Sequence, residues 1–286
     1  MLNANPELAV PPESHFLRSV ARRPRSYTPR SLIEHALRSD RFPDWDLAER
    51  GVWEAFDRAR PRSLAQAIDV LYCCFAEANG KARWGDKTPP YVMLVEQLAR
   101  LLPDARFIHL IRDGRDVALS FASVSFGPRD DPVAQAIFWR NRVTAGRRAG
   151  ASLGNDRYLE LRYEDLVARP EDVLRRVCVF VDLVFDPMML RYHETAGRSI
   201  PGSRKSYHAN VDKPLTTNLR DWRTRMTTND VAWFEAIAGD LLTDLGYETS
   251  GGMRPRGAWL RIRASEARSS LGAARIALLS RGTRAM

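Results

Sequence analysis

The stretch ARFIHLIRDGRDVALSF, residues 105–121, decides the fold class that this sequence predicts. Its first half holds a short, almost continuous apolar run over residues 107–111, which is typical of a strand buried on both faces of a parallel sheet. Asp113-Gly114 breaks that run, and apolar residues then recur at helical spacing as far as Phe121. We therefore predict a strand, a tight turn and the start of a helix.

The turn between this strand and this helix is a candidate anion site. The exposed N–H groups and the dipole of a helix start favour negative charge, and Arg112 stands at the mouth of the turn, where its guanidinium could clamp a phosphate. Ser120 lies two helical turns past Asp113 and so faces the same side of the helix. Arg112 and Ser120 could therefore bind one phosphate. Alternatively, Arg112 caps a helix or pairs with Asp113 or Asp116.

The composition is that of an ordinary globular protein. The chain has 286 residues, of which 44% are hydrophobic and 28% charged, enough for a full α/β core. No run approaches the roughly 18 apolar residues that span a bilayer, and the N-terminus shows no basic region followed by an apolar one. Cys73, Cys74 and Cys178 are odd in number and lack metal-ligand spacing, so we expect reduced, mostly buried thiols in a cytoplasmic protein.

The net charge of +9 is concentrated at the C-terminal end of the chain. Residues 251–286 hold eight arginines and a single acid, Glu266, which leaves a net charge of only +2 for residues 1–250. A nearly neutral body argues against a nucleic-acid partner. The tail could lie as a weakly amphipathic helix on an acidic membrane surface, but its short, interrupted apolar face favours a frayed, solvated helix.

Further strands and helices follow from apolar periodicity and from boundary residues. Leu8–Val10 is a candidate for a brief strand, and residues 158–163 are a candidate for a second full strand. Ser63 is placed to cap the start of a helix that ends at Asn79-Gly80. Residues 22–60 are basic, aromatic and helical in patches, and we expect a lid over the sheet edge. We also predict helices over residues 91–102, from residue 132, over 170–181 and over 229–245, and a polar loop over 198–218.

Three further residues stand in stiff backbone and could carry chemistry. Lys87 lies in the turn WGDKTPP, residues 84–90, where glycine and proline frame it, although a plain surface lysine is the simpler alternative. Glu13 and His15 follow Pro11-Pro12, and either could serve as a general base. Taken alone, a carboxylate such as Glu13 is more often found at a helix N-terminus than in catalysis.

Together these stretches resemble the 3′-phosphoadenosine-5′-phosphosulfate (PAPS)-dependent sulfotransferases, especially the branch of bacterial sulfotransferase-family proteins and protein-tyrosine sulfotransferases. The matching segments occur in family order over about residues 2–247 and are NANPELAVPPESHFL, WGDKTPPY, ARFIHLIRDGRDVALSF, LELRYEDLVARPEDVLRRV and DKPLTTNLRDWR. The resemblance implies an α/β domain over residues 1–250, with a P-loop-NTPase-like parallel sheet flanked by helices and a helical lid. Residues 251–286 would form a separate basic tail.

The resemblance also implies roles for individual residues in transfer of a sulfuryl group from PAPS to a hydroxyl or amine. Arg112 and Ser120 match the pair that holds the 3′-phosphate. Lys87 matches a lysine that stabilises charge on the leaving phosphate. No metal is required. The remaining matches are Glu13 as the base, His15 as an alternative base, Tyr163 near the nucleotide, and Lys213 as a contact from the C-terminal loop.

One segment of the family pattern is absent from the sequence. The 5′-phosphosulfate loop, a strand followed by P-R-S-G-T-T, should lie just before Met1, so we expect a sheet without its N-terminal strand and phosphate loop. We expect a start codon missed upstream rather than a natural truncation. The chain as written would bind the 3′ end of the nucleotide but would be a poor catalyst or poorly stable.

Two other functions therefore stay open beside an active sulfotransferase. One is a non-catalytic nucleotide-binding or interaction protein derived from such an enzyme. The other is a nucleic-acid or membrane binder that works through the arginine tail. The acceptor of the sulfotransferase is also open, because the predicted lid gives no recognisable pocket pattern. It could be a small molecule or a macromolecule, such as a sugar, lipid, peptide tyrosine or secondary metabolite.

Overall fold

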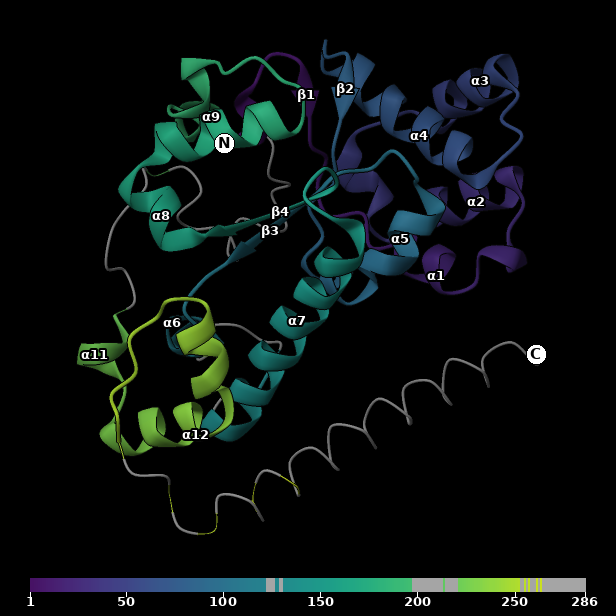
Figure 1. Ribbon diagram of the computed structural model, residues 1–286. Helices are drawn as coiled ribbons and strands as arrows, with labels where there is room; N and C mark the ends of the chain where they lie inside the picture. Colours follow the sequence, from purple (N-terminus) through teal and green to yellow (C-terminus); the bar gives the residue numbers. More distant parts are fainter. Residues whose placement is uncertain are drawn as a thin grey trace. The chain divides into compact units, whose positions relative to one another are not determined.

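The computed structural model describes residues 1–121, 127–128, 131–196, 213, 221–252, 255, 257, 261 and 263. The chain forms two compact units. The first unit consists of Met1–Leu110 and Ala145–Thr217, and the second of Ile111–Thr144 and Asn218–Met286. Figure 1 labels the elements of both units.

The described strands form two small sheets among the helices. β1 (Leu8–Ala9) pairs in parallel with β2 (Arg83–Trp84), with Leu8 opposite Arg83. β3 (Phe107–Ile111) and β4 (Tyr158–Arg162) are neighbours in the other sheet. The predicted strands at 8–10, 107–111 and 158–163 are thus confirmed, with shifts at their ends. β2 was not predicted, because two residues are too few to show a periodicity.

β3 is less buried than its apolar run predicts. Leu110 is 46% exposed, residues 107–109 are half-buried, and within the strand Ile111 alone is buried. The prediction of burial on both faces was therefore wrong. An apolar run indicates that a strand can be buried, but it does not indicate how many strands or helices pack against it. Among the described strands, β3 has the single neighbour β4.

The N-terminal helices form a layer around one long helix, α4 (Leu64–Ala78). Ser63 caps α4 as predicted, because its side chain accepts a hydrogen bond from the backbone N–H of Gln66 at 3.2 Å. Thr28 and Ser31 form a capping box at the start of α2. The layer comprises α4 with α1 (Leu17–Arg22), η2 (Pro24–Ser26), α2 (Pro29–Leu37), η3 (Phe42–Trp45) and α3 (Glu49–Ala59). The first element, η1 (Leu2–Ala4), packs on β1 and on η5 (Pro187–Met189) instead.

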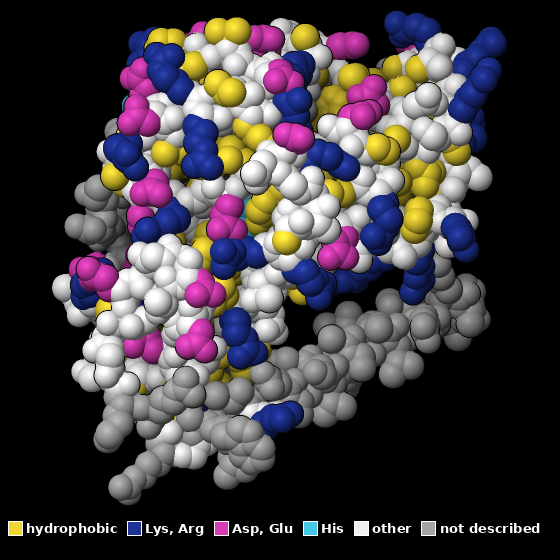
Figure 2. All heavy atoms as spheres, viewed as in Figure 1, with side chains coloured by type: hydrophobic (Ala, Val, Ile, Leu, Met, Phe, Trp, Pro, Cys, Tyr) yellow, Lys and Arg dark blue, Asp and Glu magenta, His cyan; other side chains and the backbone are white. Residues whose placement is uncertain are grey.

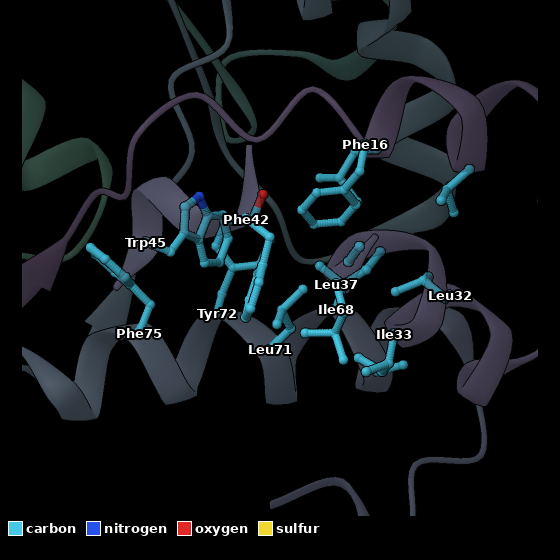
Figure 3. Packing of buried hydrophobic residues seen from close by; sticks show 14 of the residues in the cluster. Phe16, Leu32, Ile33, Leu37, Phe42, Trp45, Ile68, Leu71, Tyr72 and Phe75 are labelled. Carbon is cyan, nitrogen blue, oxygen red and sulfur yellow. The ribbon is translucent and has the colours of Figure 1, made fainter. Parts of the chain in front are cut away.

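The segment predicted as a lid, residues 22–60, belongs to the core of the first unit. α2 and α3 both pack on α4 (Figure 1). Figure 3 shows Trp45 beside two aromatic residues of α4, Tyr72 and Phe75. The ring centroid of Trp45 is 4.9 Å from that of Tyr72 and 5.5 Å from that of Phe75. Aromatic pairs at such distances add to the gain from burial. The helices of this segment are therefore held by a shared apolar core with α4.

Shorter helices complete the first unit. The helix predicted over 91–102 begins as a 3-10 helix after Pro89-Pro90 and becomes α-helical at Val95. Tyr163, which the sequence places at the end of a strand, instead opens a helix. The elements are η4 (Pro89–Leu94), α5 (Val95–Leu101), α8 (Tyr163–Ala168), α9 (Pro170–Phe180), η5 (Pro187–Met189) and α10 (His193–Ala196).

The second unit is built from helices around Ile111, the last residue of β3. Its buried apolar residues include Ile111, Trp139, Phe234 and Leu242. The helices are α6 (Gly114–Phe121), α7 (Pro132–Leu153), α11 (Trp222–Arg225) and α12 (Thr228–Asp244). Residues of α7 up to Thr144 belong to this unit, and the remainder belongs to the first. The helices predicted from residues 114, 132 and 229 are confirmed.

Acidic and basic side chains are interspersed over most of the face shown in Figure 2. Cys178 is buried, but Cys73 and Cys74 are half-buried, so "mostly buried" held for one thiol of three. None of the described helices is long and apolar enough to cross a membrane. The predicted loop at 198–218 and the tail lie outside the described residues, apart from residues 213, 251–252, 255, 257, 261 and 263.

Candidate functional site

Glu13, His15 and Lys87 lie together in the first unit, although 74 residues separate Glu13 from Lys87. The Lys87 Nζ atom is 2.5 Å from Glu13 Oε1, and His15 Nε2 is 3.1 Å from Glu13 Oε2. Each carboxylate oxygen of Glu13 therefore has its own partner. The Lys87 side chain is 61% exposed and that of Glu13 is 27% exposed, so the group faces solvent.

The pairing of β1 with β2 brings these residues together. Both strands run in the same direction, so the segments that follow them leave from the same edge. Glu13 and His15 follow β1 after Pro11-Pro12, and Lys87 follows β2 after two residues. His15 has φ +54°, a left-handed conformation that costs a non-glycine residue about 1 kcal/mol or more and often marks functional positions.

Charge in this group favours an ionised carboxylate. Burial acts to raise the pKa of Glu13, but the hydrogen bonds and charges of Lys87 and His15 outweigh it, so the pKa lies below its ordinary value. Glu13 is therefore ionised at neutral pH and able to accept a proton. Lys87 has three N–H donors, of which the Glu13 contact occupies one. The group thus offers a proton acceptor beside a solvent-exposed cation.

Arg112 and Ser120 lie in the second unit, at the two ends of the turn and helix predicted to bind an anion. Arg112 Nη2 is 2.9 Å from Asp116 Oδ2, so the alternative pairing with Asp116 is present. Asp116 also accepts a hydrogen bond from the backbone N–H of Trp222 at 3.0 Å. Ser120 Oγ donates to the Val117 carbonyl at 2.7 Å. Joint binding of a phosphate by Arg112 and Ser120 remains a prediction.

A buried arginine holds the turn that carries Arg112. The side chain of Arg115 is fully buried and forms ion pairs with Asp113 at 2.7 Å and with Glu235 at 2.6 Å. It also donates to the Glu248 carbonyl at 2.7 Å and lies over the Trp222 ring. Sequence reasoning missed this role, since nothing in the run R-D-G-R-D distinguishes a buried arginine from an exposed one.

Close packing adds to the rigidity of the turn. A Cβ atom at Gly114 would lie 2.5 Å from a ring carbon of Trp139 and 2.7 Å from one of Phe234. Glycine is therefore the residue that lets the start of α6 approach α7 and α12. The Trp139 indole N–H also donates to the Arg112 carbonyl at 3.1 Å.

Tyr163 and Lys213 both belong to the first unit. Tyr163 is half-buried at the start of α8. Lys213 is exposed, and its carbonyl accepts a hydrogen bond from the Tyr192 hydroxyl at 2.9 Å. Their contacts with a nucleotide remain predictions. Among the described residues, no three His, Cys, Asp or Glu side chains lie close enough to hold a metal ion.

Comparison with known proteins gives a consistent set of relatives. A model of the sulfotransferase family matches residues 1–187. A putative protein-tyrosine sulfotransferase of Caenorhabditis briggsae is 25% identical over 219 residues, covering 73% of this chain and 77% of that protein. Nodulation protein NoeE of Sinorhizobium fredii is 29% identical over 209 residues, covering 64% of this chain and 48% of NoeE.

Two solved structures share the fold. The sulfotransferase domain from the curacin biosynthetic pathway superposes with a TM-score of 0.57 at 19% identity, covering 87% of this chain and 92% of that domain. The sulfotransferase domain of the Synechococcus PCC 7002 olefin synthase gives a TM-score of 0.54 at 22% identity, covering 86% and 88%. The mixed α/β, P-loop-like fold that the family resemblance implied is thereby confirmed at this level.

Proposed function

The chain belongs to the sulfotransferase family, and on this premise we propose that it transfers a sulfuryl group from PAPS to a hydroxyl or amine of an acceptor. The observation that carries the proposal is the contact of Lys87 with Glu13, a cation and a proton acceptor side by side. The relatives include protein-tyrosine sulfotransferases and bacterial sulfotransferase domains, which supports this reaction class.

The residues present suit an anionic co-substrate. PAPS, when bound, supplies the activated sulfuryl group. Lys87 is exposed and keeps N–H donors beyond its Glu13 contact, so it could hold the phosphosulfate. Arg112, whose planar guanidinium suits phosphate oxygens, would bind the 3′-phosphate together with Ser120. Tyr163 and Lys213 would contact the nucleotide.

Glu13 and Lys87 would divide the work of the transfer. The acceptor proton passes to the Glu13 carboxylate while the acceptor oxygen bonds to sulfur and the bond between sulfur and the phosphate oxygen breaks. Lys87 stays protonated and stabilises the charge on the departing phosphate oxygen. His15, hydrogen-bonded to the second oxygen of Glu13, would orient the carboxylate or act as the base in its place.

The relatives also suggest a first acceptor to test. Several are protein-tyrosine sulfotransferases, so a peptide tyrosine hydroxyl is the first candidate acceptor for this chain. Transfer from radiolabelled PAPS to a tyrosine peptide, a sugar and a lipid hydroxyl would test the reaction and rank the acceptors. Nucleotide binding without transfer to any of them, in wild type, would favour the non-catalytic alternative.

Nucleotide binding can be tested through Arg112. We expect Arg112→Ala to weaken binding of 3′-phosphoadenosine-5′-phosphate roughly 10- to 150-fold in calorimetric titration, because a charge-assisted bidentate contact is worth about 1.5–3 kcal/mol. Arg175→Ala is a matched control, since Arg175 also pairs with an acid one helical turn away, Glu171 at 2.7 Å. Equal affinities in the two variants would remove Arg112 from the binding site.

A further inference from the structure

The segments that carry Glu13 and Lys87 alternate between exposed and buried side chains. Glu13 and His15 are partly exposed, whereas Ser14 between them is fully buried. Lys87 is exposed, whereas the next residue, Thr88, is 6% exposed. Each segment therefore presents its candidate catalytic side chains to solvent and turns its hydroxyl side chain inward.

Hydrogen bonds join the inward side chains of both segments to one carboxylate, that of Asp86. The Ser14 hydroxyl donates to Asp86 Oδ2 at 2.6 Å, and the Thr88 hydroxyl donates to Asp86 Oδ1 at 2.7 Å. The backbone N–H of Ser14 also donates to Thr88 Oγ1 at 3.2 Å. The two segments are thus joined on the buried side by hydrogen bonds to Asp86 and on the exposed side by the Glu13–Lys87 ion pair.

Two tyrosine hydroxyls also form hydrogen bonds with residues of this cluster. The hydroxyl of Tyr72, from α4, also donates to Asp86 Oδ2. The hydroxyl of Tyr91, from η4, is 2.8 Å from Ser14 Oγ and accepts a hydrogen bond from the Leu17 backbone N–H at 3.1 Å. The Asp86 carboxylate therefore accepts three hydroxyl hydrogen bonds.

A carboxylate in this position is costly for stability alone. Burial raises the pKa of Asp86, and the negative charge of Glu13 acts in the same direction, against the three hydrogen bonds. Replacing a buried polar group and its partners together with apolar groups of the same shape can be nearly neutral or stabilising. Asp86 belongs to the segment of Lys87, and what it supplies and an apolar side chain cannot is a directional link from that segment to Ser14 in the segment of Glu13.

We infer that Asp86 is a positioning residue that sets the separation of Glu13 and Lys87 through Ser14 and Thr88. Any effect of Asp86 on the rate of transfer rests on the proposed function. Its effect on the distance between Glu13 and Lys87 does not. Removing the link should let the two segments separate and lengthen the contact between Glu13 and Lys87. That contact can be followed without any acceptor, because the ionisation of Glu13 reports it.

The test measures the pKa of Glu13 by NMR of carboxyl-labelled glutamate, with the signal assigned from Glu13→Gln. The charged groups that act on Glu13 are Lys87 and His15, which lower its pKa, and Asp86, a like charge. We expect Asp86→Asn to raise the pKa of Glu13 because the Lys87 contact loosens. Loss of the Asp86 charge alone would lower it, so the sign distinguishes positioning from a direct electrostatic effect.

Thr88→Val changes no charge but removes two hydrogen bonds of this cluster, the one from Thr88 to Asp86 and the one that the Ser14 N–H donates to Thr88. It should also raise the pKa of Glu13, and Thr88→Ser, which keeps the hydroxyl, should restore the wild-type value. This pair remains decisive if Asp86→Asn fails to fold. An unchanged or lowered pKa in Thr88→Val, with the variant folded by circular dichroism, would overturn the inference.

Asn5→Ala controls for a general loss of stability. Asn5 is fully buried, as Ser14 is, but its side chain bonds to the Val184 carbonyl and the Glu7 N–H at 2.9 Å each, away from this cluster. It should lower the melting temperature and leave the pKa of Glu13 unchanged. Where wild type transfers sulfate, kcat should fall about 10- to 100-fold in Thr88→Val and not in Asn5→Ala. Where wild type transfers none, the proposed function fails and the pKa comparison still decides the inference.

Discussion

Glu13 has one partner on each carboxylate oxygen, Lys87 on Oε1 and His15 on Oε2. Both partners favour the ionised form and outweigh the effect of burial. The proposed base is thus ready to accept a proton over the whole neutral range. A lowered pKa also makes it a weaker base, so the proposal depends more on placement and on Lys87 than on basicity.

The pH dependence of transfer separates Glu13 from His15 as the base. If Glu13 is the base, kcat/KM should rise with pH through a single break below 4.5, the ordinary glutamate value, and stay level above it. Lys87→Met should move this break to higher pH, because the group that stabilises the ionised carboxylate is gone.

Two variants complete this comparison of kcat/KM profiles. Glu13→Gln should lower the rate about 100-fold or more and remove the break, while His15→Asn should retain it. An imidazole base would instead give a break in the neutral range. A neutral break that disappears in His15→Asn would therefore assign the base to His15 and contradict the role proposed for Glu13.

In the first unit, α7 approaches β3 and β4 closely through two glycines. A Cβ atom at Gly146 would lie 2.6 Å from the imidazole Cε1 of His109, and one at Gly150 would overlap the Tyr158 ring. The two rings are hydrogen-bonded to each other. Burial and then the charge of Arg147 lower the pKa of His109 to about 4, so this histidine packs as a neutral ring at pH 7.

Gly146→Ala should therefore destabilise the protein despite the better helix propensity of alanine. We expect a loss of about 1–3 kcal/mol, typical of overpacking, measured by urea denaturation. Gly51→Ala in α3 is the matched control, because a Cβ atom there meets nothing within 4 Å. It should stabilise by about 0.5–1 kcal/mol. A stabilising Gly146→Ala would refute the close packing of α7.

The molecule as a whole consists of two compact units, and the second has a charged centre. Arg115 links Asp113, at the start of α6, with Glu235 of α12, and all three side chains are less than 10% exposed. Removing one partner of a buried ion pair leaves the other charges without compensation. The stability of the second unit should therefore depend on Arg115 far more than that of the first.

We expect Arg115→Ala to lower the free energy of unfolding of the second unit by about 3–5 kcal/mol. Hydrogen exchange should show faster exchange in α6 and α12 and unchanged protection in α4. Arg50→Ala, which removes an exposed ion pair with Glu54 at 2.8 Å, should change stability by less than about 1 kcal/mol. Uniform loss of protection across both units would show that they do not unfold separately.

Much of the local structure could be read from short-range patterns. The strand and helix of residues 105–121, the cap at Ser63 and the breaks at prolines depend on residues a few positions apart, and the structure contains them. For these local features, the sequence by itself was sufficient. Family resemblance also singled out Glu13, His15, Lys87 and Arg112, whose roles stay predictions.

Tertiary structure decided the rest, because it depends on which distant segments meet. Three features do not follow from local spacing: the Glu13–Lys87 contact, the hydrogen bond of Asp86 with Ser14, and the burial of Arg115. Each of them requires strands or helices many residues apart to pack together. The exposure of Leu110 has the same origin, as periodicity indicates an apolar strand but not its neighbours. Backbone preferences act within a few residues, whereas burial and ion pairing are set by the packing of the whole chain.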